Sequence, residues 1–383
     1  MKNNKAKSFI LVALLALVLL FATSCYSTIG LRTLVPAEVN MTGYKTIAVQ
    51  STTYNYSPVE LIWRSYIIPV RGTIDEAYLP YINNIFTLFE TTTPTQVSTY
   101  ASDNLANAID KGFFTVDGPT LTDALILVGK NTGTVRQTLL NNNVDALLTS
   151  NISYMYYDEY ITSEPIYGGA DNKTLTGYNF YIVQKASISL TYTVTDVQDN
   201  VLIASKTVPL SSGDLKTLIG HTDPSDIKKF VKDSSVGEYL TAADIFQYLV
   251  KEILSNVTNE LTPHYETTYI DLMANKPKAD SVKDAYGYVD DGNYRVALEM
   301  FLKEYQTSGH IPSGYNAAVL YYALGDYDNA FTLASEVYNK SGNSDALSLY
   351  YTLKNIKDKQ DAAIAQIVGD KTSSSKSDEL IGF

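Results

Sequence analysis

The residue types that carry most enzyme chemistry are few in this chain and lie far apart. Its three histidines, His221, His264 and His310, fall in different predicted elements, whereas a zinc site needs several ligands that the fold brings to one point. The chain contains no Gly-x-x-x-x-Gly-Lys phosphate loop, and Gly168-Gly169 is followed by neither a lysine nor a helix signal. The sequence therefore predicts no metal site and no cofactor.

Two acidic pairs are the remaining candidates for acid or base catalysis. Asp158-Glu159 ends a predicted strand, and Asp290-Asp291 falls in a predicted helix turn. Adjacent acids in such places are far more often solvated than catalytic. We therefore expect a protein that is not an enzyme and has no catalytic residues.

Cys25, the only cysteine, is the residue with the clearest predicted chemistry. A basic start (residues 1–8) and an unbroken apolar run (Phe9–Phe21) precede Ala22-Thr23-Ser24-Cys25. The run rises only about 20 Å as a helix, against a hydrocarbon core of about 30 Å, which indicates a signal peptide and not a membrane span. Small residues before the cysteine predict cleavage there, so residues 1–24 are the expected signal peptide.

The segment that ends at Cys25 resembles the bacterial lipobox. That resemblance implies a diacylglyceryl thioether on Cys25 and an acylated amino terminus, which together anchor the protein stably in a membrane. Tyr26, where an aspartate could stand, resembles lipoproteins sorted to the outer membrane, so we expect a periplasm-facing protein of the outer membrane. The alternative is a secreted protein whose cysteine merely follows the cleavage site.

The charge balance excludes one class of partner. Without Lys2, Lys5 and Lys7, the chain keeps 26 basic against 41 acidic residues, a net charge of about −15. Nucleic acids and anionic lipids bind basic stripes, and the sequence has none. We expect no nucleic-acid partner.

The composition is unusual in its 31 tyrosines. Tyr154, Tyr156 and Tyr160 fall on one face if the strand that holds them continues, and that face could stack against a glycan. A half-buried sheet face explains the same pattern equally well, because tyrosine can replace phenylalanine at half-buried positions. The three tyrosines are therefore a candidate ligand surface with two open interpretations.

Residues 45–273 alternate between strand and helix signals. A period-2 alternation predicts a strand over Ala186–Thr195, with a turn at Asp199-Asn200. Helices are predicted from a Thr93-Pro94 start and from a Thr241 cap to Pro263. The other predicted strands are 45–51, 113–116, 144–156 and 201–208, with a short helix at 135–140 and an unassigned stretch at 52–92.

This order of elements resembles the periplasmic lipoprotein fold of the penicillin-binding-protein activators and the curli secretion lipoprotein. The matching segments are 45–49, 144–152 and the 194–205 hairpin. The resemblance implies a non-catalytic binding domain. The sequence shows no membrane-spanning hairpins of a secretion pore.

The carboxy-terminal part contains a repeat. Gly292, Tyr294 and Ala297 recur as Gly325, Tyr327 and Ala330, all at one constant offset. Residues 315–330 resemble a tetratricopeptide repeat, in which a helix ends at glycine, an aromatic residue packs the turn, and a small alanine admits the next helix. A degraded third copy is predicted at 358–363.

Such repeats bind proteins or peptides in a concave groove. Three tyrosines, Tyr286, Tyr315 and Tyr322, line that groove or form the core between helices; the core is the favoured interpretation. The alternative to a repeat is a generic bundle of helical hairpins.

We therefore expect an α+β protein, with a mixed α/β sheet domain (45–273) and an all-α repeat domain (274–370). Residues 25–44 are the predicted anchor and tether, and 371–383 are a predicted disordered tail. The expected function is a membrane-anchored adaptor that holds a protein partner in the envelope. The alternative is a lipoprotein that binds cell-wall glycan or activates an envelope enzyme.

Overall fold

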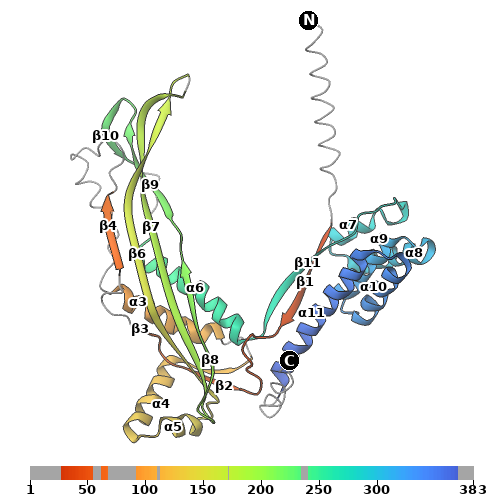
Figure 1. The fold of residues 1–383 in the computed structure, drawn as a ribbon, viewed down its shortest axis with the longest axis horizontal. Helices are drawn as coiled ribbons and strands as arrows, with labels where there is room; N and C mark the ends of the chain where they lie inside the picture. Colours follow the sequence, from red (N-terminus) through yellow and green to blue (C-terminus); the bar gives the residue numbers. More distant parts are fainter. Residues whose placement is uncertain are drawn as a thin grey trace. The chain divides into compact units, whose positions relative to one another are not determined.

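The computed structural model describes residues 27–54, 62–67, 92–109, 113–170, 172–233 and 240–369. They form two compact units (Figure 1), which we call the helical unit (27–36 and 263–366) and the sheet unit (37–262). The chain is α+β, as the sequence predicts. The predicted signal peptide, Cys25, the predicted tail and most of 52–92 lie outside the described residues. No helix in the described ranges has the length and apolarity to cross a membrane.

The sheet unit is built on one long antiparallel hairpin. Its arms, β6 (Ala146–Gly168) and β7 (Thr174–Asp196), have 23 residues each. Side chains along both arms alternate between buried and less buried, which is the predicted pattern of a strand with one face on a core. A bulge between Ile152 and Tyr154 shifts this alternation by one residue.

Seven shorter strands extend the hairpin into a nine-stranded sheet. At one end, β6 pairs in parallel with β2, which pairs with β5, while β7 pairs with β8. At the other end, β6 pairs with β4, and β7 pairs with β9, which pairs with β10. The short strands are β2 (Thr46–Val49), β3 (Thr53–Tyr54), β4 (Ile62–Ile67), β5 (Thr115–Asp117), β8 (Val201–Ser211), β9 (Leu215–Asp223) and β10 (Asp226–Lys232).

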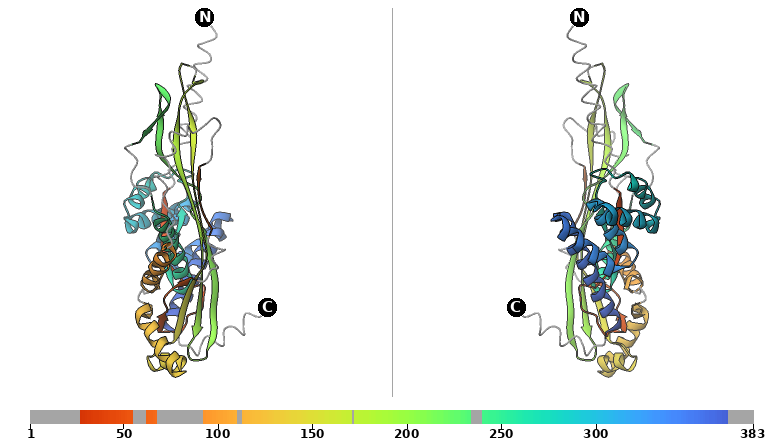
Figure 2. Two further views of the ribbon diagram at one scale, coloured as in Figure 1. Left: turned by 90° about the vertical axis from the view of Figure 1, so that its left-hand side faces the viewer. Right: turned by 90° about the vertical axis from the view of Figure 1, so that its right-hand side faces the viewer.

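Two helices, α3 (Thr93–Ile109) and α6 (Ala242–Leu261), cover one face of this sheet, and Figure 2 shows them on one side of the strands. Both bury an apolar stripe against the alternate side chains of β6 and β7. Thr241 caps α6 through a capping box with Asp244. Both helices are confirmed where the sequence predicts them. The short helix α5 (Val135–Asn141) is also confirmed, whereas α4 (Pro119–Thr132) is not predicted by the sequence.

The predicted tether is wrong for Thr28–Val35, which forms strand β1. This strand pairs antiparallel with β11 (His264–Asp271), so that Thr28 lies opposite Asp271 and Val35 opposite His264. The alternation of buried and exposed residues in β1 explains why the segment is ordered: Ile29 and Leu31 are buried in the core of the helical unit. The pairing also places β11 in the helical unit, whereas the sequence assigned residues up to 273 to the sheet domain.

Helices make up the rest of the helical unit. Their buried residues form one core with the β1–β11 ribbon. A 3₁₀ turn, η2 (Asp280–Val282), precedes them. The helices are α7 (Ala285–Asp290), α8 (Tyr294–Ser308), α9 (Ile311–Ala323), α10 (Tyr327–Ser341) and α11 (Ser344–Val368).

Candidate functional site

The two predicted repeat turns have the same hydrogen-bond pattern. Gly292 N donates to the Val289 carbonyl, and the next residue, Asn293, donates to the Tyr288 carbonyl. At the equivalent positions of the second copy, Gly325 and Asp326 make the same two bonds, to Tyr322 and Tyr321. The glycines have φ values of 73° and 83°, which other residues adopt at a cost. The turns are therefore equivalent.

The repeat extends beyond the predicted motif. Helices α8 and α10 have 15 residues each and start at Tyr294 and Tyr327, the two equivalent tyrosines of the motif. They end at Gly309 and Gly342, whose N–H groups donate to Tyr305 and Tyr338. Sequence reasoning missed these two glycines and two tyrosines, although the same offset relates each pair.

The candidate packing residues of the two motifs have equivalent surroundings. Ala297 and Ala330 are fully buried between helices, and Tyr294 and Tyr327 pack against the same core. The Tyr327 ring lies 4.7 Å from that of Tyr322, and its hydroxyl donates to Gln360 of α11 at 3.3 Å. Tyr294 and Tyr327, the aromatic residues that follow the two turns, therefore belong to the core of the helical unit.

The predicted third copy at 358–363 is wrong, because α11 runs unbroken from Ser344 to Val368. Asp358 stands where Gly292 and Gly325 stand in the other copies. A β-carbon disfavours the left-handed backbone that ends the earlier helices, so the helix continues.

We expect Gly325→Ala to lower the free energy of unfolding by about 1 kcal/mol, because alanine strains a left-handed position. Thermal or denaturant unfolding followed by circular dichroism measures the loss. Gly292→Ala should cost a similar amount; an effect at only one of the two positions would contradict the equivalence of the turns.

The sequence places Tyr286, Tyr315 and Tyr322 either in a groove or in the core between helices, and in the structure they form part of the core. Tyr315 and Tyr322 are buried, and Tyr286 packs edge-on against Phe301 with its hydroxyl on the Met273 carbonyl at 2.7 Å. Burial raises the pKa of Tyr286 and that of Tyr315 to about 12. The favoured interpretation is confirmed.

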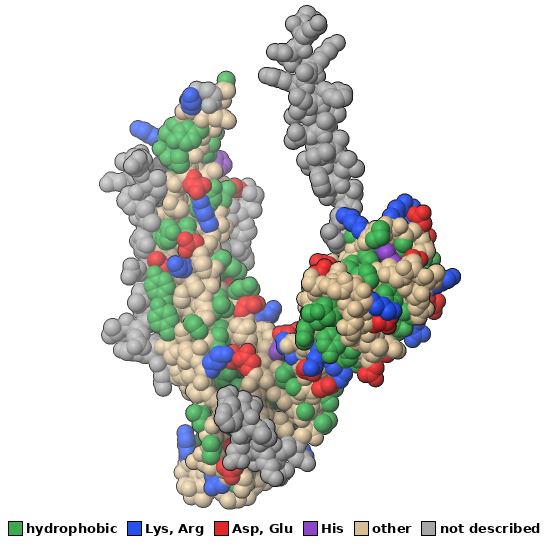
Figure 3. Space-filling model, turned by 45° about the vertical axis from the view of Figure 1, so that its right-hand side comes forward, with side chains coloured by type: hydrophobic (Ala, Val, Ile, Leu, Met, Phe, Trp, Pro, Cys, Tyr) green, Lys and Arg blue, Asp and Glu red, His purple; other side chains and the backbone are tan. Residues whose placement is uncertain are grey.

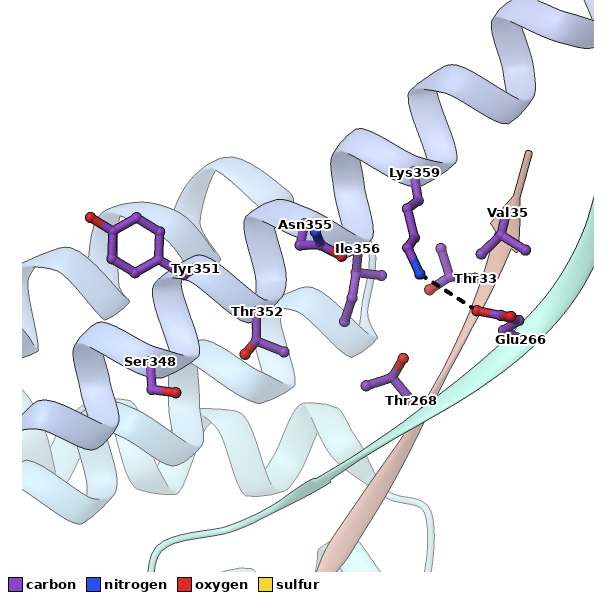
Figure 4. Close-up of a pocket in the computed structure, with 10 residues that line it drawn as sticks. All are labelled: Thr33, Val35, Glu266, Thr268, Ser348, Tyr351, Thr352, Asn355, Ile356 and Lys359. Atoms are coloured by element: carbon purple, nitrogen blue, oxygen red, sulfur yellow. Dashed lines mark ion pairs between the residues drawn. The ribbon is translucent and has the colours of Figure 1, made fainter. Parts of the chain in front are cut away.

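A different set of residues forms a groove. It lies between α11 and the inner face of the β1–β11 ribbon, the face that bears Ile29 and Leu31, and has a volume of about 400 Å³. Figure 4 shows its walls: alternate residues of both strands and successive turns of α11. Its lining residues are Thr33, Val35, Glu266, Thr268, Ser348, Tyr351, Thr352, Asn355, Ile356 and Lys359.

The groove is polar but nearly neutral. Hydroxyl and amide groups dominate its lining, with Val35 and Ile356 as apolar contacts. At one end Lys359 Nζ lies 3.8 Å from Glu266 Oε2, and the Tyr351 ring marks the other end (Figure 4). Tyr351 is 61% exposed. Such a lining suits the backbone amides and side chains of a peptide segment.

We expect the Lys359–Glu266 pair to contribute less than about 1 kcal/mol to stability, since both side chains are about half exposed. Glu266→Gln should therefore leave the unfolding midpoint nearly unchanged in a denaturant titration. A large decrease in the unfolding midpoint would show that the ion pair stabilises the fold, which would contradict the expectation.

The outer face of the ribbon is exposed and aromatic. We define it by its exposed residues, which are Thr28, Gly30, Arg32, Tyr265, Thr267, Tyr269 and Asp271. Tyr265 and Tyr269 are 59% and 74% exposed. The Arg32 guanidinium carbon lies 4.3 Å from the centre of the Tyr265 ring.

The candidate tyrosines of the sheet unit do share a face. Tyr154, Tyr156 and Tyr160 lie on the side of β6 opposite the helices, after the bulge. Tyr154 is 37% exposed, whereas Tyr156 and Tyr160 are half-buried. The Tyr156 hydroxyl donates to Asp158 at 3.1 Å.

Small hydroxyl side chains continue this face across β7 and β8. Thr191 and Thr207 are hydrogen-bonded at 2.7 Å, and Ser187 and Ser211 at 3.0 Å. Asn151 of β6 donates to Thr53 of β3 at 2.9 Å. The result is a surface rich in hydroxyl and amide groups, which we call the hydroxyl face.

The histidines and the acidic pairs lie in separate places. His310 is buried beside a second cavity of about 960 Å³, with Nε2 donating to the Pro277 carbonyl and Nδ1 bonded to Ser313. Glu159 is buried and accepts from the Tyr157 hydroxyl at 2.6 Å, while Asp158 lies on the opposite face of β6. Within the described ranges, no three potential ligands come close enough to hold a metal ion.

Charges are mixed over the helical unit. On the face of the molecule in Figure 3, basic and acidic side chains alternate there without a patch of one sign. This distribution agrees with the sequence, which has no basic stripe.

No protein-family model and no curated protein sequence match the chain. Three similar solved structures are the PelC dodecamer from Paraburkholderia phytofirmans, lipoprotein GNA1162 from Neisseria meningitidis and the LpoB C-terminal domain from Salmonella enterica. Their identities are 10%, 8% and 13%; the matches cover 61%, 56% and 44% of this chain and 96%, 99% and 84% of the others. The TM-scores are 0.22, 0.23 and 0.18, too low to assign this chain to a family.

Proposed function

We propose that this protein is a lipid-anchored lipoprotein of the cell envelope, held in the outer membrane through Cys25 and facing the periplasm. It is not an enzyme. Its helical unit acts as an adaptor that binds a protein partner, in the manner of the tetratricopeptide repeats that it resembles. The Ala22-Thr23-Ser24-Cys25 segment supports the anchor.

The groove beside α11 is the observation that carries the adaptor role. Two regular elements form its walls, so its shape is set before a ligand arrives, which lowers the entropic cost of binding. Its hydroxyl and amide groups offer hydrogen bonds to a peptide, while the exposed Tyr351 supplies apolar area of the kind that dominates interface energetics.

Photo-crosslinking in cells tests this role. A benzophenone amino acid in place of Tyr351 should give adducts with a small set of envelope proteins, and Thr352→Arg, which fills the groove, should abolish them. Tyr248 on α6 is the matched control, since it is also 61% exposed. Equal adducts from both positions, or adducts that survive Thr352→Arg, would contradict the proposal.

The hydroxyl face supports glycan binding as a second candidate function. Sugar rings stack on aromatic side chains, and their hydroxyls exchange hydrogen bonds with neutral polar groups. Tyr154 supplies an exposed ring beside the rows of Ser, Thr and Asn, and the face needs no charged ligand.

Sedimentation with purified peptidoglycan tests this candidate. The full chain should co-sediment, and Tyr154→Ala should reduce the bound fraction, whereas Tyr167→Ala, which removes an exposed tyrosine near the hairpin tip, should not. Binding unchanged by Tyr154→Ala would exclude the hydroxyl face.

A further inference from the structure

The distance between Cys25 and the first strand fixes how closely the helical unit is held to its membrane. Strand β1 begins at Thr28, three residues after Cys25. Three residues span at most about 10 Å when fully extended. The headgroup layer on each side of a bilayer is about 5 to 7 Å thick, so the start of β1 lies within or just above that layer.

We propose that the outer face of the β1–β11 ribbon lies against the headgroup layer of the phospholipid membrane that holds the Cys25 lipid. This inference rests on the lipid anchor in the proposed function. Under this inference the helical unit contacts the membrane surface directly.

The inner face of the ribbon is occupied and cannot take this role. Ile29, Leu31 and Ile270 are buried against the helices. Four further residues of that face line the groove: Thr33, Val35, Glu266 and Thr268. The broad face that remains exposed on the ribbon is the outer one. It starts at Thr28, the first residue of β1, opposite Asp271.

The side chains of the outer face suit a lipid headgroup layer. Tyrosine has an apolar ring and a polar tip, and it is enriched where hydrocarbon meets water. Tyr269 lies across Gly30, where an added β-carbon would be 3.3 Å from its ring, and Tyr265 lies against the Arg32 guanidinium. The contacts hold both rings along the face.

Charge identifies the class of lipid. The outer face carries one basic side chain, Arg32, and one acidic side chain, Asp271, so it can pair with a phosphate and with an amine but has no basic cluster for an anionic surface. The occupant we infer is therefore a zwitterionic phospholipid layer that is contacted mainly by aromatic rings.

A single labelled cysteine provides the test. Since Cys25 is the only cysteine and its lipidated sulfur is a thioether, Thr267→Cys supplies the only free thiol. The full lipidated chain, labelled there with an environment-sensitive fluorophore, is reconstituted in phosphatidylethanolamine and phosphatidylcholine vesicles. We expect a blue shift of its emission and quenching by lipids that carry a nitroxide near the headgroup.

Two controls make the result specific. The same label at Tyr351→Cys, on α11, should keep its aqueous spectrum. In a Tyr265→Ser, Tyr269→Ser background, the Thr267→Cys label should lose its blue shift and its quenching while the protein still floats with the vesicles. Both tyrosines are more than half exposed, so their loss should leave the core intact.

The outcomes separate the inference from the anchor. Mass spectrometry of the amino-terminal peptide first establishes the lipid on Cys25; an unmodified Cys25 overturns the anchor and the inference together. A lipidated protein whose Thr267 label stays in water overturns the inference alone. So does a label that is shielded only after envelope proteins are added.

Discussion

The free energy of unfolding of the helical unit is expected to fall steeply as the pH rises above about 10. Tyrosine in an unfolded chain loses its proton near pH 10. Burial raises the pKa of Tyr286 and of Tyr315 to about 12, and raises that of Tyr322 further. Between these pH values the folded state keeps protons that the unfolded state has lost.

The direction and the size of the pH effect on stability follow from this difference in pKa between the folded and the unfolded state. A proton held only by the folded state means that stability decreases with rising pH. The contribution is fully present below pH 10 and is lost as the pH approaches 12. A shift of about two pKa units corresponds to at most about 3 kcal/mol, and solvent screening reduces this value for a group that is only partly buried, so Tyr286 and Tyr315 together account for a few kcal/mol.

Circular dichroism and tyrosinate absorbance during an alkaline titration would measure the effect. Tyr315→Phe keeps the ring and removes the ionisable group, so it should move the unfolding midpoint to higher pH. Tyr269→Phe, at a 74% exposed position, should not move it. Equal titration of all tyrosines near pH 10 without loss of helix would contradict the expectation.

Gly314→Ala is expected to destabilise the helical unit by about 2 to 3 kcal/mol through overpacking. Gly314 lies in α9 where α8 and α10 approach it. A β-carbon there would lie 2.6 Å from Tyr305 Cδ2 and 2.6 Å from Val337 Cγ2. Both neighbours are buried, so neither can move away freely.

Gly287→Ala is the matched control for this substitution. Gly287 also lies in a helix, α7, but no atom lies within 4 Å of an added β-carbon. Alanine should therefore stabilise the protein slightly, by up to about 1 kcal/mol, because glycine disfavours helix. Denaturant unfolding of the two variants should give opposite signs; equal effects would show that the α8–α9–α10 contact is loose.

Local patterns predict the elements that depend on near neighbours. The glycine and aromatic residues of the repeat turns act within a few residues of each other, so the motif at Gly292 and Gly325 is visible in the sequence. The same holds for the helix cap at Thr241 and the alternation of β7. The period of the repeat, applied to the whole segment, also relates Gly309 to Gly342.

Features that depend on distant segments cannot be predicted in the same way. Strand β1 alternates apolar and polar residues, but its partner β11 begins only at His264, after the whole sheet unit. The sequence therefore predicts a tether where the structure has a strand. The groove combines this ribbon with α11, and nothing in the sequence brings Thr33 and Thr352 together. Asp358 shows the reverse error, in which a partial motif predicts a turn inside one long helix.

Val35 and His264 are the last paired residues of the β1–β11 ribbon. In chain order, the whole sheet unit therefore stands between β1 and β11, where a hairpin would have its loop. In such an arrangement one domain, the guest, is inserted into another, the host, because the chain leaves the host and returns to it at neighbouring residues. The host part can then be made contiguous by joining residues 35 and 264 through a two-residue turn, and a different guest can be placed between the same two ends.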